Sequence, residues 1–405
     1  MLALMFSTAV LQPEARAVTA NVVAALPGAN PLASPAPVGS REPYLATMPD
    51  GRFALSWLEP AGGESMALRF AIFDGKGWSK ASTIAVGDSF FVNWADVPSI
   101  RPLGGDRIAA HWLWRSGKGT YAYDVRVSQS ADAGRTWSRP ITPHRDGTAS
   151  EHGFVSLVAD TGGVLAVWLD GRKTEGHDEE SPGPMPDMTL RTASIASDGR
   201  LRNEGEIDSR TCDCCPTAAV VTDRGVLVAY RDRSSDEVRD IYVTRREADG
   251  WSSPQPVHSD DWHIAGCPVS GPALAAQQSH VAIAWYTAAA DSPRVYVAFS
   301  DDAGRHFEPP VRIDEGSALG RVSVTLLSDG SVLVTWLESS GHDALVRTRR
   351  VSASGAPGAA ITVARTSAAR SSGYPRVLTS GRTTLIAWTE AGMSPQVKLA
   401  TLELR

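Results

Sequence analysis

Four cysteines are the residues of this sequence best suited to chemistry by their type and spacing. Cys212, Cys214 and Cys215 lie within four positions of one another, and Cys267 follows further along the chain. Thiolates grouped in this way can bind a soft metal, Cu(I) or Zn(II), although C-x-C-C is not a common zinc spacing. They can equally form two disulfides in an oxidising compartment, or leave one thiol reactive. The sequence leaves these three alternatives open.

Charged side chains are concentrated in three further runs of the chain. Acids, bases and guanidinium groups gathered in one place are what a site for a charged ligand requires, although salt-bridged loops produce similar runs. The runs cover residues 144–153, 170–173 and 231–240, and they supply His144, Glu151, His152, Arg172, Arg231, Arg233 and Arg239.

Three tryptophans, Trp94, Trp114 and Trp262, are not accounted for by the strand pattern described below. An exposed aromatic face can pack against the apolar C–H face of a sugar ring. Packing within the loops explains each of them singly, so both interpretations remain.

A repeat organises the elements that must position these groups. A turn, four or five aliphatic residues and an aromatic recur at intervals of 51 to 62 residues, and such a period indicates a repeat architecture. The seven aromatic positions are Trp57, Trp112, Trp168, Tyr230, Trp285, Trp336 and Trp388. Each unit also contains an alternating segment before this strand and two after it, which predicts four short antiparallel strands per unit. We therefore expect an all-β propeller of seven four-stranded blades; an open β-solenoid or two packed sandwiches are the alternatives.

The two ends of the chain are expected to join. The seventh unit stops after its third strand, so residues 18–40, which are rich in Ala and Pro, are either a linker or the missing strand, around 21–26. Residues 1–17 resemble a secretory signal with Ala15-Arg16-Ala17 as the cleavage site, although the basic segment that normally opens a signal is missing. We expect export to the periplasm or beyond the cell; a disordered N-terminus is the alternative.

Composition excludes several classes of function. The 405 residues are 42% hydrophobic and 21% charged, which is typical of a folded chain with a large core. The formal net charge is -6 and no Lys/Arg-rich run occurs, so nucleic acid is not an expected partner. No apolar stretch is long enough for a transmembrane helix.

Propeller connectivity predicts which residues share a face. The loops that enter each blade and those that follow its second strand lie on one face, and the loops between the third and fourth strands lie on the other. All four cysteines, six of the nine histidines and the three tryptophans lie on the first face. We expect these groups to surround one polar mouth.

Two segments resemble a known structural motif. Ser130-Ala131-Asp132-Ala133-Gly134-Arg135-Thr136-Trp137 matches the S-x-D-x-G-x-T-W pattern of the Asp-box, and 300–307 matches it with His306 and Phe307 in the last two places. Through these motifs residues 41–405 resemble the sialidase superfamily of Asp-box propellers. Sialidases have six blades, which makes six the alternative to the seven counted here.

The resemblance implies a set of catalytic roles. Sialidases use three arginines to bind a carboxylate, a tyrosine nucleophile paired with a glutamate, and an aspartic acid as proton donor. By this resemblance Asp96 is the candidate acid, Tyr230 with Glu151 or Tyr374 with Glu338 is the candidate pair, and Arg41 partly matches the first arginine. Further arginines on the same face are Arg115, Arg172, Arg231, Arg233, Arg239 and Arg321.

Two functions are consistent with these observations. The first is an exo-acting glycoside hydrolase, or a recognition protein, for acidic glycans or another small anionic ligand, with Trp94, Trp114, Trp262, His144, His152, Arg115 and Arg239 in contact with that ligand. The second is a non-catalytic binding propeller in which the cysteines hold Cu or Zn or are joined by disulfides.

Overall fold

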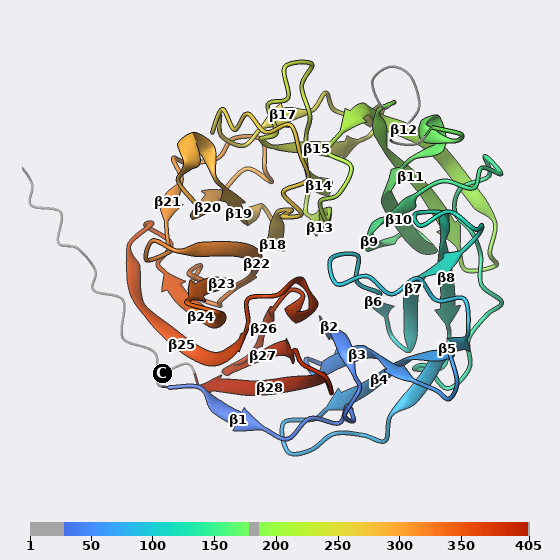
Figure 1. Cartoon of the computed structure of the whole chain (residues 1–405), viewed down its shortest axis with the longest axis horizontal. Coiled ribbons are helices and arrows are strands. Elements are labelled where there is room, and N and C mark those ends of the chain that lie inside the picture. Colours follow the sequence, from blue (N-terminus) through green and yellow to red (C-terminus); the bar gives the residue numbers. More distant parts are fainter. Residues whose placement is uncertain (1–27, 178–185, 404–405) are drawn as a thin grey trace, which may run out of the picture.

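The computed structural model describes residues 28–177 and 186–403, and in them the chain forms seven radial β-sheets around a central axis (Figure 1). Apart from strands, these residues form only three short 3-10 helices, Arg172–Thr174, Ala289–Asp291 and Arg370–Ser372. The predicted all-β propeller with seven blades is confirmed. No helix in the described part of the chain could cross a membrane.

The first four blades follow one another along the chain. Blade one contains β2 (Arg41–Thr47), β3 (Phe53–Pro60), β4 (Met66–Phe73) and β5 (Ser82–Gly87). Blade two contains β6 (Ser99–Gly104), β7 (Arg107–Arg115) and β8 (Tyr123–Ser130). Blade three contains β9 (His152–Asp160), β10 (Gly163–Asp170), β11 (Met188–Ala196) and β12 (Leu201–Thr211). Blade four contains β13 (Ala218–Thr222), β14 (Gly225–Arg231), β15 (Ile241–Glu247), β16 (Gly250–Trp251) and β17 (Gln255–Pro256).

The last three blades complete the ring. Blade five contains β18 (Ala273–Gln277), β19 (His280–Thr287), β20 (Arg294–Ser300) and β21 (Val311–Arg312). Blade six contains β22 (Ala318–Leu326), β23 (Val332–Ser340), β24 (Asp343–Val351) and β25 (Pro357–Ser367). Blade seven contains β26 (Arg376–Ser380), β27 (Thr383–Glu390), β28 (Gln396–Glu403) and β1 (Asn30–Leu32).

The strand β1 joins the two ends of the chain. It pairs with β28 in antiparallel register, with Asn30 opposite Thr401 and Leu32 opposite Leu399. This pairing covers an edge of the last blade that would otherwise expose unpaired backbone groups. The expected position of the closing strand, 21–26, lies outside the described residues.

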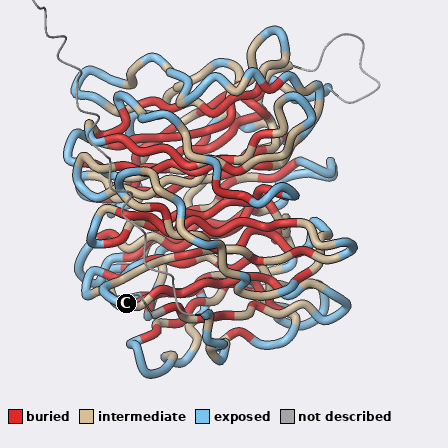
Figure 2. The backbone as a smooth tube through the Cα atoms, turned by 90° about the vertical axis from the view of Figure 1, so that its left-hand side faces the viewer, coloured by how far each residue is buried: buried red, intermediate tan, exposed pale blue. Residues whose placement is uncertain are grey.

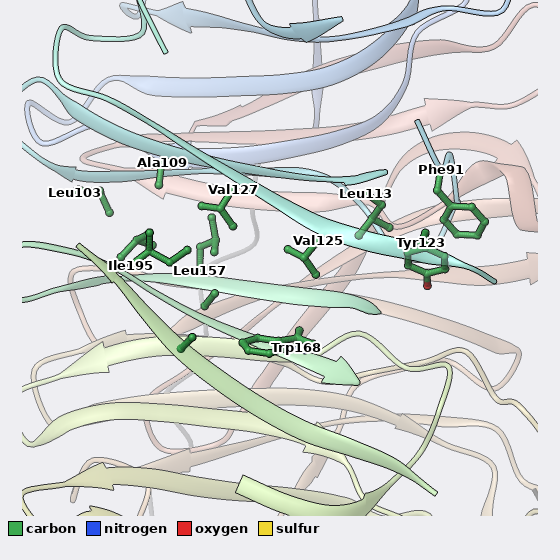
Figure 3. Packing of buried hydrophobic residues seen from close by; sticks show 13 residues of the cluster. Phe91, Leu103, Ala109, Leu113, Tyr123, Val125, Val127, Leu157, Trp168 and Ile195 are labelled. Atoms are coloured by element: carbon green, nitrogen blue, oxygen red, sulfur yellow. The ribbon is translucent and has the colours of Figure 1, made fainter. Parts of the chain in front are cut away.

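Apolar second strands form the core between blades. In β10 all eight residues are buried, because each face of a blade packs against a neighbouring blade. The repeated aromatic of this strand, Trp168, is fully buried in a cluster that spans blades two and three and includes Val125 and Leu157 (Figure 3). Figure 2 shows the same pattern along the axis, with buried strands inside and exposed loops at the two faces.

The two turns that resemble Asp-boxes are held by their own side chains. Ser130 Oγ donates to Asp132 Oδ1 at 2.8 Å and accepts the Gly134 backbone N–H at 2.9 Å, while the Thr136 N–H donates to Asp132. Gly134 has φ +80° and packs so closely on Phe70 of blade one that a Cβ would come within 2.3 Å of the ring. The turn therefore requires glycine both for its backbone and for its contact with the adjacent blade.

Candidate active site

A cavity of about 810 Å³ runs between the first strands of the blades. Its polar lining includes Asp96, Arg101 and Arg376 together with Tyr44 and Tyr374. These residues lie before or near the beginning of β2, β6 and β26. Because the first strands of a propeller all run in the same direction, these groups lie at one end of the cavity, which we call the mouth.

Arg376 is a buried arginine at the mouth that has no ion-pair partner among the described residues. Its guanidinium group lies 5.3 Å from the centroid of the Tyr44 ring and 5.6 Å from that of Tyr374. Its Nε is buried without a hydrogen-bond partner, and no carboxylate of the described residues lies within 4.0 Å of it. Burial lowers the pKa of Arg376, which expresses the cost of a charge without a counterion. A buried polar group of this kind requires an explanation, and an anionic ligand supplies one.

Further cations and aromatic rings continue from Arg376. Arg101 donates to the Leu157 carbonyl at 2.7 Å, and Arg321 lies 4.6 Å from the centroid of the Trp94 ring. Trp94 in turn stacks on Tyr374 at a centroid separation of 6.2 Å. In the described residues neither arginine has a carboxylate within 4.0 Å.

Three residues at the beginning of first strands have a strained backbone conformation. Glu42, Phe154 and Arg321 have φ of +57°, +54° and +57° at the beginning of the first strands of blades one, three and six. Around Glu42 and Arg321 the pairing with the second strand shifts register, as in a β-bulge. Such bulges redirect side chains and are frequent beside functional sites.

Two carboxyl groups meet at one tyrosine beside the mouth. Tyr123 Oη donates to Glu151 Oε1 at 2.7 Å and lies 3.2 Å from Asp96 Oδ2. The tyrosine ring stacks on Phe91 at 4.0 Å, at the end of the core cluster shown in Figure 3. We call Asp96, Tyr123 and Glu151 the acid cluster. Asp96 is 1% exposed and lines the cavity, whereas Tyr123 is fully buried and does not line it.

Burial keeps both carboxyl groups of the acid cluster protonated at higher pH than usual. It raises the pKa of Asp96 to about 7, although hydrogen bonds from the Phe154 N–H and Tyr123 act in the opposite direction. Burial and the nearby Asp96 raise the pKa of Glu151 to about 8 against the hydrogen bond from Tyr123. A carboxyl group with a pKa near neutrality is suited to general acid catalysis.

Gly153 permits the close approach of Asp96 and Tyr123. A Cβ at this position would lie 2.0 Å from Asp96 Oδ2 and 2.9 Å from Tyr123 Oη. Both contacts are shorter than any that real side chains make, so only glycine fits beside the acid cluster.

A second charged group, in blade three, is paired largely within the protein. His144 and His152 stack at 3.7 Å, and Asp146 lies 3.3 Å from a ring nitrogen of each. Arg172 contacts Asp170 through Nε at 2.7 Å and Nη2 at 2.8 Å, and Asp146 at 3.2 Å. We call these five residues the ion-pair cluster. The structure thus brings together His144, His152 and Arg172, as the polar runs led us to expect, but it compensates the charge of Arg172 within the protein.

The predicted arginines of blade four hold loops rather than face the cavity. Arg231 is 1% exposed and donates to the carbonyls of Ser270 and Tyr286 at 2.7 to 3.0 Å. Arg233 forms an ion pair with Glu237 at 2.6 Å, and Arg239 forms another with the same glutamate at 2.9 Å. Their donors are therefore used inside the protein, and a catalytic role for Arg231 and Arg233 stays a prediction that this geometry does not favour.

The three tryptophans are also used for packing. Trp94 lies between Arg321 and Tyr374, and Trp262 is buried beneath Arg231, whose guanidinium carbon lies 4.8 Å from its ring centroid. Trp114 packs on Phe90 and against Gly87, where a Cβ would come within 2.3 Å of the indole. Loop packing, the second interpretation, accounts for all three rings. Arg115 is exposed and lies over the Phe91 ring at 5.2 Å.

Neither predicted tyrosine and glutamate pair forms. Tyr230 donates to Asp208, and Tyr374 donates to the Val269 carbonyl at 2.8 Å. Glu338 accepts the backbone N–H of Glu315 at 3.0 Å. The partner of Glu151 is instead Tyr123, which begins the third strand of blade two directly after a loop of the mouth face. Tyr123 and Arg376 were not predicted from the sequence. Each begins a strand next to a loop of the mouth face, and this position could have identified both residues.

The four cysteines are free thiols on the same face. Cys212 Sγ lies 3.5 Å from Cys215 Sγ and 3.8 Å from Cys214 Sγ. The loop that carries Cys267 also contacts the mouth, because Val269 accepts the hydrogen bond from Tyr374. Cys267 Sγ lies 3.7 Å from Asp213 Oδ1.

No protein family and no curated protein sequence matches this chain. Among solved structures, the chain is similar to the Hadza microbial sialidase Hz136 (TM-score 0.50, 14% identity, 85% of this chain and 75% of that one). It is also similar to polysaccharide lyase Uly1 (TM-score 0.51, 8% identity, 90% of each chain). A sialidase from Trypanosoma rangeli aligns with TM-score 0.47 and 12% identity over 81% of this chain and 56% of that one. The chain therefore has the sialidase-like β-propeller fold.

Proposed function

We propose that this protein binds an acidic sugar at the mouth and cleaves its glycosidic bond, with Asp96 as the proton donor. The observation that carries the proposal is one cavity lined both by an acid, Asp96, and by an arginine, Arg376, that has no carboxylate within 4.0 Å among the described residues. Two proteins of similar fold are named as a sialidase and a polysaccharide lyase, so this fold supports action on glycans elsewhere.

Arg376 recognises the carboxylate in this proposal. The guanidinium group lies over the rings of Tyr44 and Tyr374, and its planar donors fit a carboxylate in two parallel hydrogen bonds. Arg321 and Arg101 add positive charge to the same end of the cavity. An acidic sugar entering the cavity supplies the missing negative charge.

Asp96 donates the proton to the leaving oxygen, and water supplies the hydroxyl group that replaces this oxygen on the anomeric carbon. With a pKa of about 7 Asp96 is largely protonated in mildly acidic solution and half protonated at neutral pH, and it lines the cavity. Tyr123 is fully buried and does not line the cavity, so we assign it no direct attack on the sugar. Its hydroxyl instead joins Asp96 to Glu151 and holds the acid in place, and the proton released by the attacking water restores Asp96 after each turnover.

Turnover of fluorogenic glycosides tests this proposal. Wild-type protein is assayed with sialic acid and glucuronic acid glycosides and with a neutral glucoside as the control substrate. We expect release from an acidic glycoside only, and a fall of about 10²- to 10⁴-fold in kcat for Asp96→Asn. The matched control is Asp88→Asn, an exposed carboxyl group eight positions earlier, which should leave kcat unchanged.

Arg376→Met and Arg376→Lys separate binding from chemistry. Loss of a charge-assisted contact costs about 1.5 to 3 kcal/mol, which corresponds to roughly a 10- to 150-fold rise in KM for Arg376→Met. Arg376→Lys should recover part of this loss because it keeps the charge without the planar donors. If the protein binds an acidic sugar but wild type and variants show no turnover, the protein is a recognition propeller and not an enzyme. If it binds neither sialic acid nor glucuronic acid, both the enzymatic and the recognition function are excluded.

A further inference from the structure

Three sulfur atoms of the mouth face have the spacing of metal ligands. Ligand atoms of Cys212, Cys214 and Cys215 all lie within 4.8 Å of one another, and the two printed Sγ separations from Cys212 are 3.5 and 3.8 Å. A metal with sulfur ligands at about 2.3 Å holds neighbouring sulfurs roughly 3.8 Å apart in tetrahedral geometry, and slightly further in a trigonal plane. The thiols already have this separation as free cysteines.

The loop that carries these thiols is held in place by its surroundings. It joins β12 to β13, and Cys212 and Cys215 are each 1% exposed. The Ser270 backbone N–H donates to Cys215 Sγ at 3.3 Å, and the Cys212 N–H donates to the Arg231 carbonyl at 3.1 Å. Groups that hydrogen-bond to a ligand atom in this way orient it for a metal.

Two buried cations lie beside the thiols. Arg239 Nη1 lies 3.3 Å from Cys212 Sγ and also pairs with Glu237 and Asp213. Arg231, 1% exposed, has no carboxylate within 4.0 Å among the described residues and donates to the carbonyl of Arg239. Exchange of three thiol protons for one Cu(I) leaves two net negative charges, of which Arg231 offsets one and Arg239 stabilises the Cys212 sulfur by its hydrogen bond.

The position of the fourth cysteine decides between metals. Cys267 lies within 4.8 Å of Cys214 and Asp213, but it does not form one group at that spacing with all three of the other thiols. Structural zinc requires four ligands in a tetrahedron, whereas thiolate groups also select Cu(I), which accepts three. We propose that Cys212, Cys214 and Cys215 form a three-thiolate site for Cu(I), with Arg239 and Arg231 as its charge partners.

Anaerobic titration of the reduced full chain with Cu(I), in competition with the chelator bathocuproine disulfonate, tests the site. We expect one Cu(I) per chain, a thiolate-to-copper absorption band in the ultraviolet, and three sulfur neighbours by X-ray absorption spectroscopy. Binding of zinc with four sulfur or oxygen neighbours and no preference for Cu(I) would overturn the assignment, as would a chain that binds neither metal.

Cysteine variants give the matched comparison. Cys214→Ser should weaken Cu(I) binding by at least 100-fold, because the remaining pair of thiolates is incomplete, and Cys267→Ser should bind as the wild type does. Equal losses in both variants would contradict a three-thiolate site. Near-ultraviolet circular dichroism of each metal-free variant shows whether the fold is kept, and the X-ray absorption spectrum of the wild type decides the question if Cys214→Ser does not fold.

Discussion

The ion-pair cluster and the acid cluster are two buried charged regions of neighbouring blades with opposite electrostatics. In the ion-pair cluster Arg172 and the two histidines surround Asp146 and Asp170; burial alone would raise the pKa of Asp170, but the hydrogen bonds from Arg172 lower it below its ordinary value. In the acid cluster two carboxyl groups share one tyrosine, and burial raises the pKa of both.

This contrast separates a structural role from a functional one. Charges that are paired inside the protein have no need of a ligand, and removing one partner leaves the other buried and uncompensated. In the cavity, by contrast, Asp96 has a disfavoured charged form and Arg376 has no counterion among the described residues, which is the environment expected of a ligand site. We therefore infer that Arg172 and Asp170 stabilise the fold, whereas Asp96 and Arg376 act on a bound ligand.

The largest expected effect is on folding, in the ion-pair cluster. Asp170→Asn leaves the Arg172 charge without its bidentate partner, and we expect a loss of about 3 to 5 kcal/mol in the free energy of unfolding. Asp96→Asn removes a carboxyl group whose charged form is disfavoured, so at pH 8 it should cost no stability or increase it. Urea denaturation of both variants measures this difference, and equal losses would erase the distinction between the two clusters.

A smaller effect is expected at Gly153. Gly153→Ala forces Asp96 and Tyr123 apart, because the new Cβ overlaps Asp96 Oδ2. Overpacking of this kind costs about 1 to 3 kcal/mol of stability. The pKa of Asp96, followed by the pH dependence of turnover, should change in this variant, whereas Gly147→Ala, in an open turn with φ +75°, should leave that pH dependence as it is.

The smallest effect is the pH dependence of stability, which should have opposite signs in the two clusters. The pKa of Asp96 is raised to about 7, so its contribution is full below its ordinary value near 4 and is lost as pH rises through 7. The pKa of Asp170 is lowered, so its contribution is present above its ordinary value and is lost as pH falls below it. Unfolding midpoints between pH 3 and 9 check this: Asp96→Asn should flatten only the fall in stability between about pH 4 and 7, and Asp170→Asn only the fall below pH 4. A single change affecting both falls would contradict the separation.

The repeat was sufficient to predict the ring. Aromatics such as Trp168 and Trp336 recur at the same place in each blade because each second strand packs on both neighbouring blades. The pattern depends only on residues close together in the chain, so it can be recognised in the sequence. The same reasoning grouped His144, His152 and Arg172, whose runs are close in sequence. It paired Tyr230 with Glu151 incorrectly, because loops on one face can meet in many ways and hydrogen-bond partners depend on rotamers and loop paths.

The sequence by itself determined seven repeating sheets, the sharing of one face by the cysteines and the polar loops, and Asp96 as a candidate acid. The tertiary structure alone decided that Tyr123 joins Asp96 to Glu151 and that Arg376 lines the cavity without a counterion among the described residues. It also decided that Arg231 donates its hydrogen bonds to backbone carbonyls. The physical reason is the closed ring. Strand periodicity is set by neighbours along the chain, whereas contacts at the mouth join residues from blades that only closure brings together.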